Sequence, residues 1–333
     1  MDALTRPRIY ITQPVARSAI ERLRAVADVE WNQDPLRILD KDALCAAVGK
    51  HDILFCLLHD RIDREVIAAN PHLRAIATMK ITPSDIDVSE ATVRRIPITV
   101  IPAIVTEATA DIHWALLLAV ARRVVEGDRL VREGIFPGSQ SSYLEAAMVS
   151  GKVLGLVGGG GRIGRAVARR ARGFGMRALY WGPRRLPESD EQESSLTYVS
   201  LEQLLAEADF VSLHSPLRPD TYHQIGAREL GLMKPTAFLI NTARGAIVDE
   251  VALSVALAER RIAGAGLDVF EDEPHVTPAL LKLTNTVLTP HLGSAVTELR
   301  ETMAHFVVDN ILAILNGQQP PNCCNPEIYA TAS

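Results

Sequence analysis

KVLGLVGGGGRIGRAVARRARGFG occupies positions 152–175 and contains three elements in succession. A short apolar run at 153–157, bounded by glycine, predicts a buried strand. Four glycines, 158–161, follow this run, and a helix rich in alanine and arginine begins close to position 162. The order strand, glycine turn, helix is the context in which a G-x-G-x-x-G spacing is credible as a phosphate-binding turn.

The glycine spacing predicts a dinucleotide site. Glycine is needed where the backbone turns tightly and approaches a pyrophosphate, and the free N–H groups of the following helix then hold the anion. We expect this contact from Gly159, Gly161, Arg162, Ile163 and Gly164. On this motif alone, a glycine turn without a ligand remains the alternative.

Composition limits the classes of partner. The chain has 333 residues, a length that fits two domains, and its formal charge of −5 without a basic run argues against nucleic acid and membrane partners. No C-x-x-C pair occurs, and the histidines lack ligand spacing, so we expect no metal. With no apolar signal segment at the N-terminus, these features predict a reduced, cytoplasmic protein.

Apolar runs alternate with helical segments along the whole chain. Four predicted strands precede the glycine turn, at 8–12, 52–58, 73–79 and 98–101. More follow the turn, at 177–181, 209–213, 237–241, 264–269 and 286–288. This alternation predicts an α/β fold with two Rossmann-like or flavodoxin-like domains, parallel sheets and an active-site cleft between the domains.

Two long helices suggest where the domains meet in sequence. The stretch 105–123 is apolar nearly all round, so it is buried either under a sheet or in a subunit interface, and we favour a dimer interface. The helix 296–315 leaves the nucleotide domain, and we expect it to return to the first domain. The predicted division is a substrate domain of 1–102 plus 297–333 and a nucleotide-binding domain of 103–296.

Polar motifs follow three of the predicted strands. They are Asn241-Thr-Ala-Arg244-Gly, Asp268-Val-Phe-Glu-Asp-Glu273-Pro274 and Thr289-Pro-His291-Leu-Gly-Ser294. With the glycine turn and in this order, they resemble the D-2-hydroxyacid dehydrogenase family over roughly the whole chain. That family includes glyoxylate/hydroxypyruvate reductases and phosphoglycerate, formate and phosphite dehydrogenases.

The resemblance implies three catalytic residues. Arg244 would bind the substrate carboxylate and polarise the keto oxygen, since a guanidinium is always charged and can donate two parallel hydrogen bonds. His291 would give a proton to the oxygen while a nicotinamide gives hydride to carbon, and Glu273 would orient His291. Glu271 is a nearby alternative to Glu273, and the Glu-Pro step favours Glu273. By the same resemblance, further cofactor contacts are Gly182, Pro216, Thr221, Thr242, Ala243, Asp268, His291 and Ser294, with Asp268 near the nicotinamide amide and Pro216 on the adenine side.

The end of the second strand of the nucleotide unit predicts the type of nicotinamide. An NAD site expects an acidic residue there, whereas this chain has Gly182-Pro-Arg184-Arg185. Two arginines would attract a 2′-phosphate, so we predict NADPH/NADP. A solvated loop in an enzyme that also takes NAD is the alternative.

The chain departs from the family pattern at two places. The turn 158–161 carries one extra glycine, which leaves open whether Gly158 or Gly159 begins the fingerprint. The segment expected to hold the substrate carboxylate is Lys80-Ile81-Thr82-Pro83, in which Thr82 replaces a glycine and Pro83 lacks an N–H. Lys80 would bind a second acidic group or an inorganic oxyanion, or would pair with Asp85 or Asp87.

We therefore predict an NADPH-dependent homodimer that reduces a small 2-oxo acid, such as glyoxylate or hydroxypyruvate, to the D-2-hydroxy acid. Two alternatives stay open. One is oxidation of phosphite or formate, and the other is a non-catalytic dinucleotide-sensing protein on the same fold.

Overall fold

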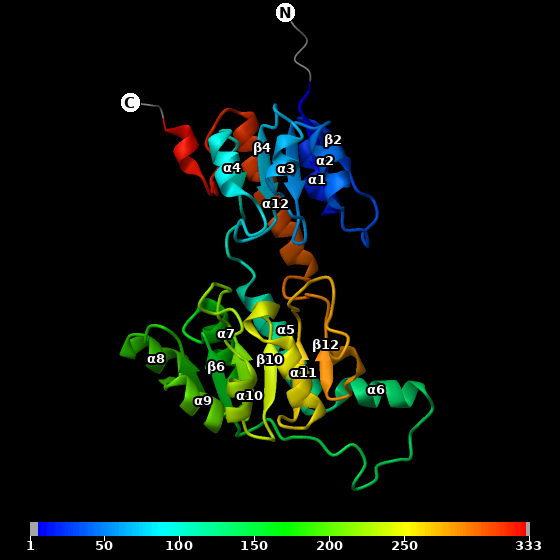
Figure 1. Ribbon diagram of the computed structural model, residues 1–333, viewed down its shortest axis with the longest axis vertical. Coiled ribbons are helices and arrows are strands. Elements are labelled where there is room, and N and C mark those ends of the chain that lie inside the picture. Colours follow the sequence, from blue (N-terminus) through cyan, green and yellow to red (C-terminus); the bar gives the residue numbers. More distant parts are fainter. Residues whose placement is uncertain (1–5, 331–333) are drawn as a thin grey trace, which may run out of the picture. The chain divides into compact units, whose positions relative to one another are not determined.

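The computed structural model describes residues 6–330 and divides the chain into two compact units, each built around one parallel sheet (Figure 1). The first unit runs to Ile104 and resumes at Val296, and the second is Val105–Ala295. The predicted fold class, α/β with two parallel sheets, is confirmed.

The first unit contains a five-stranded sheet in the order β2-β1-β3-β4-β5. Its inner strands β3 and β4 are buried on both faces, which explains their continuous apolar sequences ILFC and AIAT. The strands are β1 (Arg8–Ile11), β2 (Asp28–Trp31), β3 (Ile53–Cys56), β4 (Ala75–Thr78) and β5 (Ile98–Thr99). The helices are α1 (Arg17–Arg24), α2 (Lys41–Val48), α3 (Arg64–Ala68), α4 (Val88–Val93) and α12 (Thr297–Leu315), followed by the 3₁₀ turn Pro326–Tyr329.

The second unit contains a seven-stranded sheet in the order β12-β11-β10-β9-β6-β7-β8. The strands are β6 (Val153–Val157), β7 (Arg177–Trp181), β8 (Leu196–Tyr198), β9 (Phe210–Leu213), β10 (Phe238–Asn241), β11 (Gly264–Leu267) and β12 (Thr286–Leu288). The strand order reverses between β6 and β9, and doubly wound sheets bind ligands beyond the carboxyl ends of the strands at such a point. The glycine turn directly follows β6, so it lies at this switch point.

Helices cover both faces of the second sheet. On one face lie α5 (Thr106–Ala121) and α7 (Arg162–Ala171), and on the other lie α9 (Leu201–Glu207), α10 (Ala227–Leu232) and α11 (Glu250–Ala258). Successive strand residues alternate between these two cores, as Tyr180 and Leu179 do in β7. The remaining helical segments are α6 (Val124–Arg132), α8 (Glu188–Ser194) and the 3₁₀ turns Arg172–Phe174, Gly245–Ile247 and Leu280–Lys282.

Helix α5 is buried inside its own unit. Its apolar side chains, among them Trp114, Leu116, Leu117 and Val120, belong to the core formed with α7 and the sheet. Burial under the sheet of its own unit, one of the two explanations for its apolar sequence, is therefore observed. The dimer interface that we favoured for this helix stays a prediction.

Two strands were not predicted from the sequence. Both β2 and β8 are sheet edges, and the DVEW sequence of β2 has no fully buried position. An edge strand buries less surface than an inner strand, so its sequence lacks the continuous apolar run that marked the others. Within residues 6–330, no helix has the length and apolar character that crossing a membrane requires.

Candidate active site

The glycine turn after β6 is too tightly packed for side chains. Gly158 has a φ of +78°, and a Cβ there would lie 2.6 Å from the backbone nitrogen of Ser215. A Cβ on Gly159 would lie 2.5 Å from the Cβ of Leu156, and one on Gly164 would lie 2.5 Å from the Gly159 oxygen. Gly159 and Gly164 thus allow the close packing of helix on strand that a dinucleotide fingerprint needs, while Gly158 makes the preceding left-handed turn.

The start of α7 has the donors that a pyrophosphate requires. Gly161 is the N-cap and has no side chain to cap the helix, and it is exposed. The backbone N–H groups of Arg162 and Ile163 donate to no other residue in the described part of the chain. A cradle of glycines beneath uncapped helix N–H groups fits a dinucleotide.

In the loop after β7, the two adjacent arginines expected to bind the 2′-phosphate have different ionic partners. Arg185 donates from Nε and Nη2 to the Glu191 carboxylate at 2.9 and 2.8 Å, and the hydroxyl of Tyr180 donates to the same carboxylate at 2.7 Å. Arg185 and Tyr180 lower the pKa of Glu191 to about 2. Arg184 is exposed, and its guanidinium forms no hydrogen bond or ion pair with another described residue. The pair Arg185–Glu191 is electrically neutral, so Arg184 carries the uncompensated charge of this loop.

The turn after β10 presents Arg244. Asn241 closes this turn, because its Nδ2 donates to the Arg244 oxygen at 3.0 Å and its Oδ1 accepts from Ala243 N at 3.0 Å. The Arg244 side chain is exposed, and its Nη1 donates to the Ala243 oxygen at 2.6 Å. The Thr242 hydroxyl is buried without a partner among the described residues, which suits a group expected to contact a cofactor.

A backbone contact connects the Arg244 turn to the next strand end. A Cβ on Gly245 would lie 1.8 Å from the carbonyl carbon of Phe270, so this position admits glycine alone without a shift of the backbone. Phe270 begins the loop that carries Glu273. Arg244 and Glu273 therefore stand on segments that touch directly.

Glu273 lies beside His291. Its Oε2 is 2.8 Å from His291 Nδ1, and its Oε1 accepts from Phe270 N at 3.0 Å. Because a carboxylate only accepts hydrogen bonds, Nδ1 carries the proton of this contact. The alternative acid Glu271 instead accepts from Tyr222 and contacts His223 Nε2 at 2.7 Å.

Asp268 shapes the loop on which His291 stands. Its buried carboxylate accepts from Thr289 Oγ1 at 2.5 Å, Leu292 N at 2.7 Å and Gly293 N at 2.9 Å. Burial raises the pKa of this carboxyl, while these donors oppose the shift. The resemblance implied a place near the nicotinamide amide, and the structure shows the carboxylate bound to the 289–293 loop.

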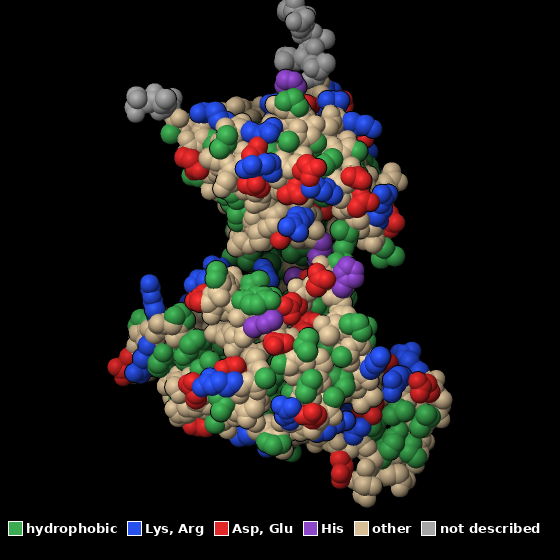
Figure 2. Space-filling model, viewed as in Figure 1, with side chains coloured by type: hydrophobic (Ala, Val, Ile, Leu, Met, Phe, Trp, Pro, Cys, Tyr) green, Lys and Arg blue, Asp and Glu red, His purple; other side chains and the backbone are tan. Residues whose placement is uncertain are grey.

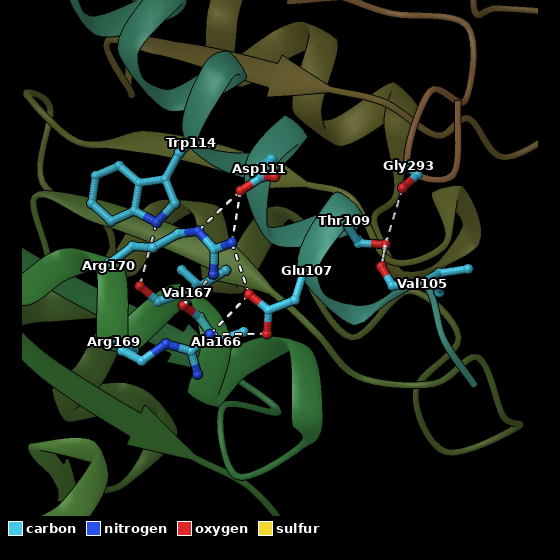
Figure 3. A network of polar contacts seen from close by, with 10 residues as sticks. All are labelled: Val105, Glu107, Thr109, Asp111, Trp114, Ala166, Val167, Arg169, Arg170 and Gly293. Atoms are coloured by element: carbon cyan, nitrogen blue, oxygen red, sulfur yellow. Dashed lines mark hydrogen bonds and ion pairs between the residues drawn. The ribbon is translucent and has the colours of Figure 1, made fainter. Parts of the chain in front are cut away.

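Helix α5 contacts both α7 and the loop that carries His291 (Figure 3). Arg170 bonds Asp111 and Glu107 at 2.7 and 2.9 Å, and Trp114 Nε1 donates to the Val167 oxygen at 3.3 Å. In the same first turns of α5, Thr109 Oγ1 lies 3.3 Å from the Gly293 oxygen. Helix α7 and the 289–293 loop are therefore both held in place by contacts with α5.

In the first unit, the predicted substrate segment follows β4. Lys80 is 5 % exposed, and its Nζ pairs with Asp85 at 3.0 Å and donates to the Ser84 oxygen at 3.1 Å. Lys80 is thus paired with Asp85 inside its own loop, which was one of the alternatives predicted for it. Its positive charge, which had suggested binding of an inorganic oxyanion, is therefore balanced by Asp85. The N–H groups of Ile81 and Thr82 donate to no other described residue, so they remain suitable for a carboxylate.

The other expected cofactor residues lie in loops at the carboxyl ends of strands. Thr221 Oγ1 donates to the Pro216 oxygen at 2.7 Å, which closes the loop after β9. The Gly182 carbonyl accepts from Tyr198 at 3.1 Å, and Ser294 is half-buried after Gly293. Among residues 6–330 there is no group of three or more His, Cys, Asp or Glu side chains placed to hold a metal ion.

The sequence analysis did not identify residues that hold the loops of the site in place through hydrogen bonds or close packing. Asn241, Gly245, Glu191 and Glu250 are of this kind, and each is buried. A polar residue next to an apolar run was a usable signal for Asn241. The partners of Glu191 and Glu250 depend on which loops meet in space, and no local pattern indicates them.

Comparison with known proteins agrees with this geometry. Residues 114–293 match the model of the D-isomer specific 2-hydroxyacid dehydrogenase NAD binding domain. The chain is 45 % identical to a glyoxylate reductase of Thermococcus litoralis, over 98 % of this chain and 99 % of that one. A Thermus thermophilus structure superposes with a TM-score of 0.87 at 43 % identity, covering 95 % and 99 % of the two chains. An NADPH-dependent glyoxylate/hydroxypyruvate reductase of Sinorhizobium meliloti gives 0.78 at 30 % identity, covering 96 % and 99 %.

Proposed function

Because this chain belongs to the D-isomer specific 2-hydroxyacid dehydrogenase family, we propose that it reduces glyoxylate, and related small 2-oxo acids such as hydroxypyruvate, to 2-hydroxy acids. The observation that carries this proposal is the 2.8 Å contact between His291 and Glu273, on a loop that touches the Arg244 turn. The full-length similarity to a glyoxylate reductase supports the choice of substrate.

The residues take separate roles in the proposed reaction. The Arg244 guanidinium binds the substrate carboxylate and polarises the keto oxygen. His291 donates the proton from Nε2 to that oxygen, and Glu273 stabilises the ring orientation and its protonated form. A bound nicotinamide supplies the hydride to carbon.

We assign NADPH as the preferred cofactor and Arg184 as the residue that selects it. No carboxylate stands in the loop after β7 to repel a 2′-phosphate, and Arg184 is exposed there without a counter-ion among the described residues. The NADPH-dependent relative from Sinorhizobium meliloti supports the same assignment. Gly159, Gly161, Arg162, Ile163 and Gly164 would hold the pyrophosphate at the start of α7.

Initial rates of cofactor oxidation test the proposal. Purified protein is mixed with NADPH or NADH and with glyoxylate, hydroxypyruvate or pyruvate, and the 2-hydroxy acid is identified chromatographically. We expect turnover with glyoxylate and a higher kcat/KM for NADPH than for NADH. No 2-hydroxy acid from any of the three substrates with either cofactor would overturn the proposed activity.

We also propose a homodimer, with the α6 segment as its contact. No residue of α6 is buried, although Val124, Val125 and Val131 are apolar, and Ile135 and Phe136 after it are exposed too. Figure 2 shows hydrophobic side chains gathered on this part of the surface. A helix with an uncovered apolar side is unstable alone in water, and a second copy would cover it.

Light scattering after size exclusion tests the dimer. Val125→Glu, which places a charge among these apolar side chains, should shift the protein to monomer. Val93→Glu is the matched control, because Val93 is 81 % exposed in the first unit. A wild-type monomer, or a dimer that Val125→Glu leaves intact, would contradict this contact.

A cytoplasmic location is part of the same proposal. All four cysteines, Cys45, Cys56, Cys323 and Cys324, are free thiols. Burial raises the pKa of the Cys56 thiol to about 12, which keeps it unreactive. Free thiols suit a reducing compartment.

A further inference from the structure

Glu250 is a buried carboxylate that the proposed reaction does not use. It is the first residue of α11 and is 3 % exposed. The start of this helix is already capped by Asp249, whose side chain accepts from Ala252 N at 2.9 Å. Burial of a carboxylate is costly unless both oxygens accept hydrogen bonds, so its partners show what it stabilises.

Both partners of Glu250 belong to one loop. Oε1 accepts from the backbone N–H of Glu271 at 2.7 Å, and Oε2 accepts from Thr277 Oγ1 at 2.5 Å. These two residues flank Glu273, which is itself only partly buried. Glu250 therefore fixes both ends of the segment that presents Glu273.

The neighbouring contacts make this anchoring relevant to the site. The consecutive N–H groups of Phe270 and Glu271 are bound by Glu273 and by Glu250, at 3.0 and 2.7 Å. The same backbone is pressed against Gly245, next to Arg244. The loop is thus held between the Arg244 turn and the start of α11, and Glu273 reaches His291 from that position.

We propose that Glu250 is a positioning residue for the reaction, which holds the 271–277 loop so that Glu273 stays within hydrogen-bond distance of His291. This inference rests on the proposed function only in taking that pair as the proton-transfer group. Glu250 touches neither substrate nor cofactor; it acts through Glu273.

Three substitutions test the inference in the full chain. Glu250→Ala removes both bonds, Thr277→Val removes one, and Glu250→Gln keeps both, because its carbonyl accepts from Glu271 N and its amide donates to Thr277 Oγ1. Glu259→Gln, at the other end of α11 and exposed, is the matched control. For each variant, kcat and KM for glyoxylate, the Kd of NADPH and the Tm are measured.

We expect Glu250→Ala to lower kcat about 10–100-fold, since small misplacements of reacting groups have effects of that size, while the Kd of NADPH stays unchanged. Glu250→Gln should restore most of kcat, and Thr277→Val should give a smaller loss. Wild-type kcat in Glu250→Ala would overturn the inference, as would a Glu250→Gln variant as slow as Glu250→Ala. Should Glu250→Ala fail to fold, Thr277→Val replaces it, and a Thr277→Val kcat equal to that of the wild type would overturn the inference.

A spectroscopic readout separates this inference from the activity itself. The hydrogen-bonded Nδ1 proton of His291 is followed by NMR at low field and assigned by its loss in His291→Gln. It should persist in wild type, Glu250→Gln and Glu259→Gln, and broaden or vanish in Glu250→Ala. An unchanged resonance in Glu250→Ala would overturn the inference even if kcat falls. Absence of turnover in wild type would instead contradict the proposed function, and this resonance would still test Glu250.

Discussion

Arg184 and Arg185 are adjacent in sequence and differ in their charge environment. The bidentate pair with Glu191 neutralises Arg185, whereas Arg184 has no counter-ion among the described residues. We expect Arg184→Ala to raise the Kd of NADPH about 10–100-fold, the range for a lost hydrogen bond to a charged group, and to leave the Kd of NADH unchanged. Fluorescence titration with each cofactor measures both constants.

Arg185→Ala is the natural comparison for that measurement. It leaves the Glu191 carboxylate without its cation, so we expect a lower Tm and similar changes in affinity for both cofactors. If Arg185→Ala abolishes the preference for NADPH and Arg184→Ala preserves it, the roles assigned to the two arginines are reversed.

The arginines also show where residue-level prediction from sequence ends. Charge and position indicated a phosphate-binding loop, but the bond from Arg185 to Glu191 depends on how α8 folds back toward β7. Lys80 is similar, since its sequence neighbours Asp85 and Asp87 were both possible partners and only the folded loop selects Asp85. The sequence predicts which polar residues lie at the ends of strands. Which of several nearby residues each one pairs with depends on the tertiary structure.

At the scale of elements, the Arg244 turn packs directly against the loop that carries Glu273, and the backbones meet at Gly245. We expect Gly245→Ala to lower the Tm and kcat together, because its Cβ would overlap the Phe270 carbonyl carbon and the backbone must move. Gly231→Ala is the matched control, since a Cβ on this helical glycine meets nothing within 4 Å. Thermal melts and initial rates are measured for both variants. Equal Tm and equal kcat in Gly245→Ala and Gly231→Ala would show that Gly245 does not hold the two loops together.

Every inner strand was predicted from the sequence, whereas the edge strands were predicted only in part. Those buried on both faces, such as β3, β4, β9 and β10, have continuous apolar runs, and each was predicted close to its observed bounds. Of the four edge strands, β5 and β12 were predicted, and β2 and β8 were not. For α5, the apolar sequence indicated burial but not which surface buries it, and within its unit the sheet does so.

At the scale of the whole molecule, the buried His113 and the half-buried His214 beside it make stability depend on pH. His113 and His214 have ring centroids 5.6 Å apart, and both nitrogens of His113 lack a partner among the described residues. Burial lowers the pKa of His214 to about 3 and holds that of His113 well below 6.5. Below pH 6.5 the unfolded chain therefore binds more protons than the folded chain, and stability falls as the pH drops.

Chemical denaturation at pH 7 and pH 5 measures this dependence. His113 alone should decrease the free energy of unfolding by about 2 kcal/mol between these values, at 1.36 kcal/mol per pH unit below 6.5. His113→Leu should reduce the difference by that amount, and His275→Gln, at an exposed position, should not. Equal pH dependence in His113→Leu and wild type would show that His113 is not buried in its neutral form.

The central claim is that His291, oriented by Glu273, gives the proton in the reduction of a 2-oxo acid. Its most direct test is kcat for glyoxylate in His291→Gln, with the Kd of NADPH measured on the same preparation. Glutamine keeps a donor toward Glu273 but cannot give up a proton near neutral pH. The account predicts a kcat about 10²–10⁴-fold below wild type with an unchanged Kd. A kcat close to wild type would contradict it.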